Sequence, residues 1–180
     1  AVVAYLGATG RIDRYASVVV ADCGDTGMSL YTVDPASHRI SAPMRSRALA
    51  GRDVDRAIVA ELISDEPHRD STVARGRRSA LLSACRAAKE EVTPLGDDSV
   101  ALTDGRGHPR LTSAVVDRAL APLVDEARTV ITRYLSESAV RDTRPEAVVL
   151  VGGIANLPAV RSMLDSAAVE VVVPETPELA

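Results

Sequence analysis

The fold is decided by a short apolar run and the glycine turn behind it, Ser17-Val18-Val19-Val20-Ala21-Asp22-Cys23-Gly24-Asp25-Thr26-Gly27. A second run of the same kind lies far along the chain, Ala147-Val148-Val149-Leu150-Val151-Gly152-Gly153-Ile154-Ala155-Asn156-Leu157-Pro158. Each run predicts a buried strand, and glycines just past a strand let backbone N–H groups approach a phosphate or nucleoside without a Cβ in the way. A helix that starts at such a turn adds its positive N-terminal end. We therefore expect the two turns to lie at the same edge of one sheet, where they would clasp one nucleotide.

The composition predicts a globular protein and argues against nucleic acid as a partner. The chain has 180 residues, of which 46% are hydrophobic, so it can bury a core in one domain or two small subdomains. Its net charge is −4 and Lys89 is its one lysine, which leaves no basic reservoir for a phosphate backbone. The chain contains neither Phe nor Trp and so offers few stacking surfaces for bases.

Other features of the sequence indicate a cytoplasmic piece of a longer protein. No stretch reaches the roughly 18 apolar residues of a membrane span, and no signal peptide is recognisable. Cys23 and Cys85 are the only cysteines and are expected to be free thiols in a reducing compartment. The chain begins without methionine in what resembles the second half of a helix, Ala1-Val2-Val3-Ala4-Tyr5-Leu6. It ends in an expected loop followed by the start of a further helix, within Pro174-Glu175-Thr176-Pro177-Glu178-Leu179-Ala180.

The spacing of the apolar residues predicts an alternation of strands and helices that begins with an antiparallel meander. The expected strands cover 17–22, 28–33, about 38–49, 100–102, 110–111, 147–151 and 169–173. The expected helices cover 53–64, 72–92, about 112–135 and about 158–167. The hydroxyl of Thr112 is suited to cap the third of these helices.

This order is that of one lobe of an actin-like ATPase, and four motifs resemble those of the DnaK-type heat-shock chaperones. Asp22-Cys23-Gly24-Asp25-Thr26-Gly27-Met28-Ser29-Leu30 resembles their second phosphate loop. Leu49-Ala50-Gly51-Arg52-Asp53-Val54-Asp55 resembles their Leu-Gly-Gly-x-Asp-Phe-Asp turn, and Ala84-Cys85-Arg86-Ala87-Ala88-Lys89 resembles the helix that reaches the adenosine. Val151-Gly152-Gly153 with Leu157-Pro158 is similar to their adenosine loop. The motifs occur in order over nearly the whole chain.

The resemblance implies an α/β, ribonuclease H-like lobe, in which a mixed sheet with flanking helices carries a smaller α+β insertion. The inner subdomain would comprise 1–52 and 112–180, and the outer one 53–111. In the family, ATP or ADP with magnesium lies between this lobe and a first lobe. That missing lobe supplies the first phosphate loop, a lysine and the carboxylates that organise magnesium. This piece alone is therefore not expected to hydrolyse ATP, and its implied partners are the first lobe and a client or co-factor protein.

The resemblance implies nine cofactor contacts and neither a catalytic residue nor a metal ligand in this lobe. They are Asp22, Gly24, Asp25, Thr26, Gly27, Lys89, Gly152, Gly153 and Asn156. Several positions depart from the family. Asp25 and Thr26 stand at two of its glycines, and Gly27 stands at its threonine. A carboxylate about 4 Å from a phosphate costs on the order of several kcal/mol at an effective dielectric near 20. In the adenosine loop, Ile154 replaces a serine, and Asn156 replaces the arginine that packs on the adenine.

Each assignment has an alternative. Asp22 either binds a magnesium-bound water or caps its turn. Gly24 and Gly27 are turn glycines whatever the ligand, and the Gly152-Gly153 pair lets strand and helix pack closely with or without nucleotide. Lys89 contacts a ribose or a neighbouring carboxylate of its helix.

Two functions stay open from the sequence. The first is an ATPase-type chaperone module that closes on ATP. The second is a pseudo-ATPase that kept the fold as a scaffold or protein-interaction module. The arginine-rich, lysine-poor, alanine-rich composition resembles high-GC actinobacterial proteins, and the second function then includes a link to specialised secretion.

Overall fold

The computed structural model describes residues 12–63, 72–92, 100–101, 110–140, 144–165 and 169–175. The chain divides into two compact units by its internal contacts. Unit 1 comprises Ala1–Gly51 and Val124–Ala180, and unit 2 comprises Arg52–Leu123.

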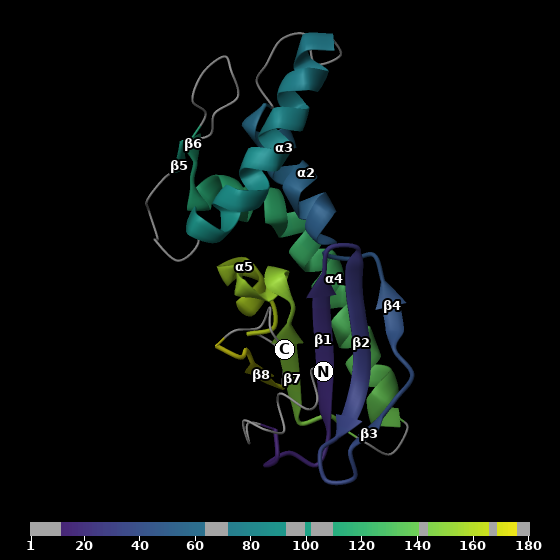
Figure 1. Cartoon of the computed structure of the whole chain (residues 1–180). Helices are drawn as coiled ribbons and strands as arrows, with labels where there is room; N and C mark the ends of the chain where they lie inside the picture. Colours follow the sequence, from purple (N-terminus) through teal and green to yellow (C-terminus); the bar gives the residue numbers. More distant parts are fainter. Residues whose placement is uncertain are drawn as a thin grey trace. The chain divides into compact units, whose positions relative to one another are not determined.

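Unit 1 contains a mixed sheet (Figure 1). Its strands are β1 (Val18–Gly24), β2 (Gly27–Asp34), β3 (Arg39–Ile40), β4 (Met44–Ser46), β7 (Ala147–Val151) and β8 (Glu170–Val172). The order is β3-β2-β1-β7-β8, and β4 also pairs with β2. β1 is antiparallel to β2 and parallel to β7, which is parallel to β8. The mixed sheet with flanking helices expected from the sequence is confirmed.

The core of unit 1 is centred on β1 and β7, whose valine-rich runs are buried on both faces. Ile12 and Tyr15 pack against one face of the sheet. α4 (Ser113–Val140) lies across the other face from Val124 onward (Figure 1). There the hydroxyl groups of Thr32 and Tyr134 are 3.2 Å apart, which ties β2 to the helix.

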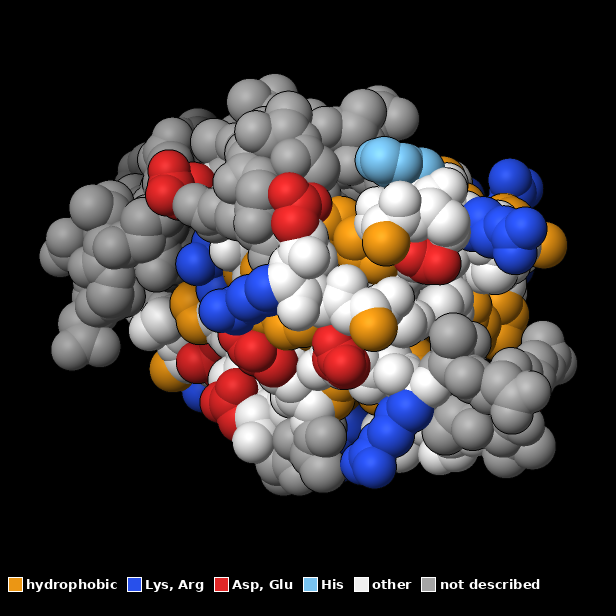
Figure 2. All heavy atoms as spheres, turned by 90° about the horizontal axis from the view of Figure 1, so that it is seen from below, with side chains coloured by type: hydrophobic (Ala, Val, Ile, Leu, Met, Phe, Trp, Pro, Cys, Tyr) orange, Lys and Arg blue, Asp and Glu red, His pale blue; other side chains and the backbone are white. Residues whose placement is uncertain are grey.

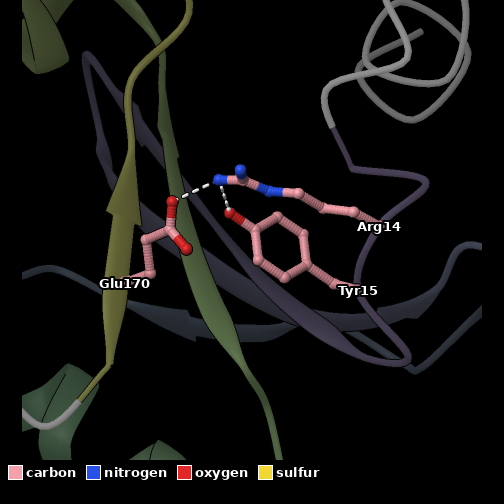
Figure 3. Close-up of polar contacts among 3 residues, drawn as sticks. All are labelled: Arg14, Tyr15 and Glu170. Carbon is pink, nitrogen blue, oxygen red and sulfur yellow. Dashed lines mark hydrogen bonds and ion pairs between the residues drawn. The ribbon is translucent and has the colours of Figure 1, made fainter.

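The segment before β1 is fastened to β8, on the far side of β7, by three side chains (Figure 3). Arg14 donates a hydrogen bond to the hydroxyl of Tyr15 and forms an ion pair with Glu170 of β8. The guanidinium carbon of Arg14 lies 4.8 Å from the centroid of the Tyr15 ring, in reach of a cation–π interaction. Burial raises the pKa of Tyr15. The contacts connect two ends of the chain that are distant in sequence.

The single strand expected at about 38–49 is wrong, because two short strands, β3 and β4, lie there. Leu30 and Val33 of β2 are three residues apart in the sequence. The residues that pair with them, Met44 and Ile40, are four residues apart. One extra residue therefore forms a bulge near Pro43, which has no N–H to donate to a ladder.

Unit 2 consists of helices and a hairpin, each close to its predicted range. It contains α3 (Thr72–Val92), β5 (Val100–Ala101), β6 (Arg110–Leu111), the start of α4, and α2 (Gly51–Leu62) except for its first residue, Gly51, which belongs to unit 1. The Thr112 hydroxyl accepts a hydrogen bond from the N–H of Val115 at 3.3 Å, as expected for a cap. Asp55 of α2 is buried and accepts a hydrogen bond from Nε of Arg86 at 3.1 Å, which ties α2 to α3.

The predicted length of the helix over about 158–167 is wrong. A 3-10 turn, η1 (Gly153–Asn156), precedes α5, which covers only Pro158–Arg161. The hydroxyl of Ser162 donates to the carbonyl of Pro158 at 3.1 Å, and hydroxyls that compete for backbone carbonyls weaken a helix. Turns follow to 165, while 166–168 lie outside the described residues, as does the helix expected at 1–6.

Candidate functional site

The two glycine turns leave the sheet at the same edge. β1 and β7 are parallel neighbours, and Asp22 pairs in register with Val151. β1 ends at Gly24, two residues after Asp22, and the hairpin turn begins at Asp25, while Gly152 follows Val151 directly. The expectation that both turns lie at one edge of one sheet is confirmed.

Gly152 has a conformation and an environment that only glycine fits. Its φ is 92° and its ψ 160°. A Cβ placed there would lie 2.4 Å from the carbonyl oxygen of Cys23 and 3.1 Å from Oδ1 of Asp22. A Cβ on the neighbouring Gly153 would meet nothing within 4 Å. The close approach of the second turn to the end of β1 therefore depends on Gly152.

Asp22 directs its carboxylate toward Gly152 and is only partly exposed. Burial raises the pKa of Asp22. No hydrogen bond to its carboxylate occurs within the described part of the chain. Burial, with a smaller contribution from the charge of Asp22, raises the pKa of Tyr31 and of the Cys23 thiol to about 12 each. Asp22 is thus a half-buried carboxylate whose oxygens are available to water or to a hydrated cation.

Replacing Asp22 with asparagine is expected to stabilise the chain increasingly as pH rises. The folded state raises the pKa of Asp22, so it binds the proton more tightly than the unfolded state does. Ionisation then costs stability, a cost that is absent below the unfolded pKa of about 4 and complete above the folded pKa. Urea denaturation between pH 4 and pH 7 measures the difference between Asp22→Asn and the parent chain.

Asp34→Asn is the matched control with the opposite sign. Hydrogen bonds from the hydroxyl and the N–H of Ser37 lower the pKa of Asp34, so its ionised form stabilises the fold. This variant should lose stability relative to the parent as pH rises from the lowered folded pKa of Asp34 to its unfolded pKa of about 4, so its denaturation series extends below pH 4. Parallel pH profiles for both variants would contradict the assignment of Asp22 as a desolvated carboxylate.

In this hairpin, the position that must be occupied by glycine is Gly27. Asp25 and Thr26 form the two-residue turn between β1 and β2. Over the described stretches, positive φ among non-glycine residues occurs at His38 and Leu49, so neither turn residue needs to be glycine. Gly27 has a φ of 142°, and a Cβ there would lie 2.2 Å from the carbonyl oxygen of Ser46.

Side chains from the two turns converge on Gly51, the first residue of α2. A Cβ on Gly51 would lie 3.2 Å from Cδ1 of Ile154 and 3.5 Å from Oδ1 of Asp25. Ile154 is buried, with 6% of its surface exposed. A carboxylate from the first turn and an aliphatic side chain from the second therefore meet over this glycine.

Asn156 closes the second turn through an arginine of α5. Its Oδ1 accepts a hydrogen bond from a terminal nitrogen of Arg161 at 3.0 Å, and Nε of Arg161 donates to the carbonyl of Ala155 at 3.3 Å. The guanidinium of Arg161 is thus held on this loop by two acceptors.

Eight of the nine expected residues belong to unit 1 and lie at this edge of its sheet. Lys89 belongs to α3 of unit 2, and its side chain lies outside the described residues. The sequence interpretation missed Gly51 and Arg161 as contributors. Gly51 lies in the Leu-Ala-Gly motif, which is the signal that would have identified it, whereas Arg161 has no local signal.

The face of the molecule drawn in Figure 2 has no concentrated patch of one charge. Figure 2 shows acidic, basic and hydrophobic side chains interspersed over the face seen from below. In the described ranges, no three His, Cys, Asp or Glu residues gather closely enough to hold a metal ion. No helix among the residues placed by the structure has the length and hydropathy to cross a membrane.

Comparison with known proteins gives consistent matches. A family model described as "Hsp70 protein" matches residues 3–170. The chaperone protein HscA homolog of Bordetella pertussis is 34% identical over 146 residues, covering 78% of this chain and 23% of that protein. The HscA homolog of Pseudomonas putida is 30% identical over 154 residues, covering 83% and 24%. The chaperone protein DnaK of Cenarchaeum symbiosum is 28% identical over 129 residues, covering 66% and 20%. The chain spans at most about a quarter of the length of these relatives.

Proposed function

Because the chain belongs to the Hsp70 family, we propose that it forms the second lobe of that family's nucleotide-binding domain. The parallel β1–β7 pair with both glycine turns at one edge supports this placement. The inner subdomain would comprise 1–52 and 112–180, and the outer one 53–111. In the whole protein the lobe would act with the first lobe on ATP or ADP with magnesium, and with a client or co-factor protein.

We propose further that the phosphate loop of this lobe is degenerate. The observation that carries the proposal is the convergence of Asp25 and Ile154 on Gly51. A carboxylate within about 4 Å of a phosphate oxygen costs on the order of several kcal/mol, and the buried Ile154 side chain occupies space beside it. The residues at this point therefore do not fit a triphosphate. Asp22, in contrast, would be suited to hold a magnesium-bound water if the first lobe supplied the remaining ligands.

Calorimetric titration with magnesium-ATP tests the degenerate loop. The chain is expected to bind ATP no tighter than high micromolar, on the order of −5 kcal/mol. Asp25→Gly should strengthen binding by roughly 1–3 kcal/mol, because it removes the charge and restores the glycine of the family.

Two controls separate the causes. Asp25→Asn removes the charge but keeps the side chain, so it divides the electrostatic effect from crowding. Asp125→Asn removes a carboxylate of α4 that is ion-paired with Arg128, and it should leave ATP binding unchanged. Sub-micromolar binding by the unmodified chain would refute the degenerate loop. If neither Asp25 variant gains affinity, then Ile154 and Asn156, rather than Asp25, are the cause of weak ATP binding.

The second candidate function is a pseudo-ATPase scaffold, which the same convergence over Gly51 favours. Under this proposal the full-length protein binds its protein partner equally well with and without ATP, and the link to actinobacterial specialised secretion belongs here. A chaperone ATPase would instead change partner affinity on nucleotide addition. Partner binding measured in the presence and absence of magnesium-ATP distinguishes the two.

A further inference from the structure

A pocket of unit 1 lies at the end of the sheet away from the glycine turns, between β2 and α4 (Figure 1). It is open to solvent and has a volume of about 640 Å³. Thr32 and Asp34 alternate along β2 and therefore face the same side of the sheet, where Tyr134 of α4 lies against Thr32. Every lining residue that the structure describes belongs to unit 1, and none is at the edge where Asp22 meets Gly152. The pocket is therefore separate from the candidate nucleotide site.

Three hydroxyl groups meet in the wall of this pocket. The hydroxyl oxygen of Tyr134 lies 3.2 Å from Oγ1 of Thr32 and 3.3 Å from Oγ of Ser41. Ser41 is held in place because its Oγ accepts a hydrogen bond from the N–H of Thr32, and its own N–H donates to the carbonyl of Thr32, both at 2.9 Å. The backbone of β2 and the helix α4 therefore position the three oxygens before any ligand binds.

Ser17, the residue before β1, adds a buried hydroxyl to the same pocket. Ser17 is 2% exposed, and its Oγ has no hydrogen-bond partner among the described residues. Buried polar groups in folded proteins are nearly always paired, so an orphaned one in the wall of a pocket indicates a place where a bound molecule completes the pairing. A hydroxyl oxygen can accept a hydrogen bond, so Ser17 can take a donor group of a ligand.

The charge of the pocket is dominated by one carboxylate, that of Glu137. Arg39 pairs in register with Asp34, and its positive charge adds to the hydrogen bonds from Ser37 that lower the pKa of Asp34. These two opposite charges of the lining therefore offset each other. Glu137 forms no ion pair or hydrogen bond within the described ranges, and Arg133, one turn earlier on α4, is not part of the lining. An unpaired carboxylate beside hydroxyl groups favours a cationic donor.

The pocket has an apolar part as well as a polar one. Glu137 lies three residues after Tyr134 on α4, so the carboxylate and the phenol share one face of the helix. The bulged segment of β3 and β4 contributes apolar side chains, those of Ile40, Pro43 and Met44. Ile40 is 54% exposed, although a large apolar side chain gains from burial. This lining suits a small molecule with a charged head and a short hydrocarbon chain.

We propose that this pocket binds a small primary amine through Glu137, Ser17 and Tyr134. A protonated primary amine has three N–H donors and no acceptor, so one carboxylate and two hydroxyl oxygens complement it. Its hydrocarbon chain would cover Ile40 and Met44. The proposal does not rest on the nucleotide-binding functions, because none of these residues belongs to the glycine turns.

NMR titration of the isotope-labelled full chain with n-butylammonium chloride, at constant ionic strength, tests the site. We expect saturable shifts in the amide resonances of the residues that line the pocket. Glu137→Gln removes the charge and keeps the shape of the side chain, so it should weaken binding at least about tenfold. Ser17→Ala removes one hydrogen-bond acceptor and should weaken binding roughly threefold to tenfold. Thermal melts check that each variant is folded.

Glu126→Gln is the matched control, because Glu126 is an exposed carboxylate of the same helix outside the pocket. It should bind n-butylammonium like the parent. Equal losses in Glu126→Gln and Glu137→Gln would overturn the proposal, since they would reflect only the overall charge of the chain. Equally tight binding of n-butanol, which has no charge, or of tetramethylammonium, which has no N–H donor, would overturn it too, as would shifts that do not saturate. ATP is absent from this titration, so its result does not bear on the Asp25→Gly test.

Discussion

Gly152→Ala is expected to destabilise the folded chain by about 3 to 5 kcal/mol, a loss at the upper end for single substitutions. A Cβ at this position would lie 2.4 Å from the carbonyl oxygen of Cys23, and the φ of 92° is one that alanine rarely adopts. This clash is relieved only if β7 moves away from β1, and both strands lie at the centre of the core. Chemical denaturation monitored by circular dichroism measures the change.

Gly153→Ala is the matched control for this prediction. A Cβ on Gly153 meets nothing within 4 Å, and its φ is not in the left-handed region. Its stability should stay within about 0.5 kcal/mol of the parent. Similar losses in the two variants would show that the η1 turn, rather than the contact with Cys23, is sensitive to substitution.

Gly27→Thr is expected to destabilise the chain by about 2 to 4 kcal/mol, although it restores the residue type of the family's phosphate loop. Gly27 has a φ of 142°, and its Cβ would lie 2.2 Å from the carbonyl oxygen of Ser46. A β-branched side chain adds to that clash. Equilibrium urea unfolding gives the loss, with Gly24→Ala for comparison.

Gly24 tolerates a side chain because its Cβ would lie 3.6 Å from the carbonyl oxygen of Gly27, an ordinary contact. Gly24→Ala should therefore cost less than about 1 kcal/mol. A stable Gly27→Thr variant would mean that β4 moves away at little cost. The family loop is thus not recoverable one residue at a time, because Asp25→Gly is compatible with this hairpin and Gly27→Thr is not.

Sequence pattern predicted those parts of the fold that depend on local periodicity. The valine runs of β1 and β7 and the apolar spacing of α3 have no competing interpretation, so their positions agree with the structure. The bulge near Pro43 and the early end of α5 were missed. Both depend on single residues, a proline without an N–H and a serine hydroxyl that binds a carbonyl.

For the candidate site, the sequence predicted the strands and glycine turns but not the side-chain contacts between distant segments. Parallel neighbours with glycine turns must meet at one edge, so the position of Asp22 beside Gly152 followed from pattern. The meeting of Asp25, Gly51 and Ile154 joins three distant segments of the chain and depends on tertiary packing.

The buried Cys23 thiol gives this lobe a built-in reporter of its own opening. Thiol reagents attack the thiolate, and with a pKa of about 12 almost none is present near neutral pH. The side chain also has no exposed surface, so a reagent reaches it only after β1 separates from its neighbours. In a chain whose Cys85 has been replaced, the labelling rate would therefore follow the opening of the central strand, much as amide exchange follows local unfolding.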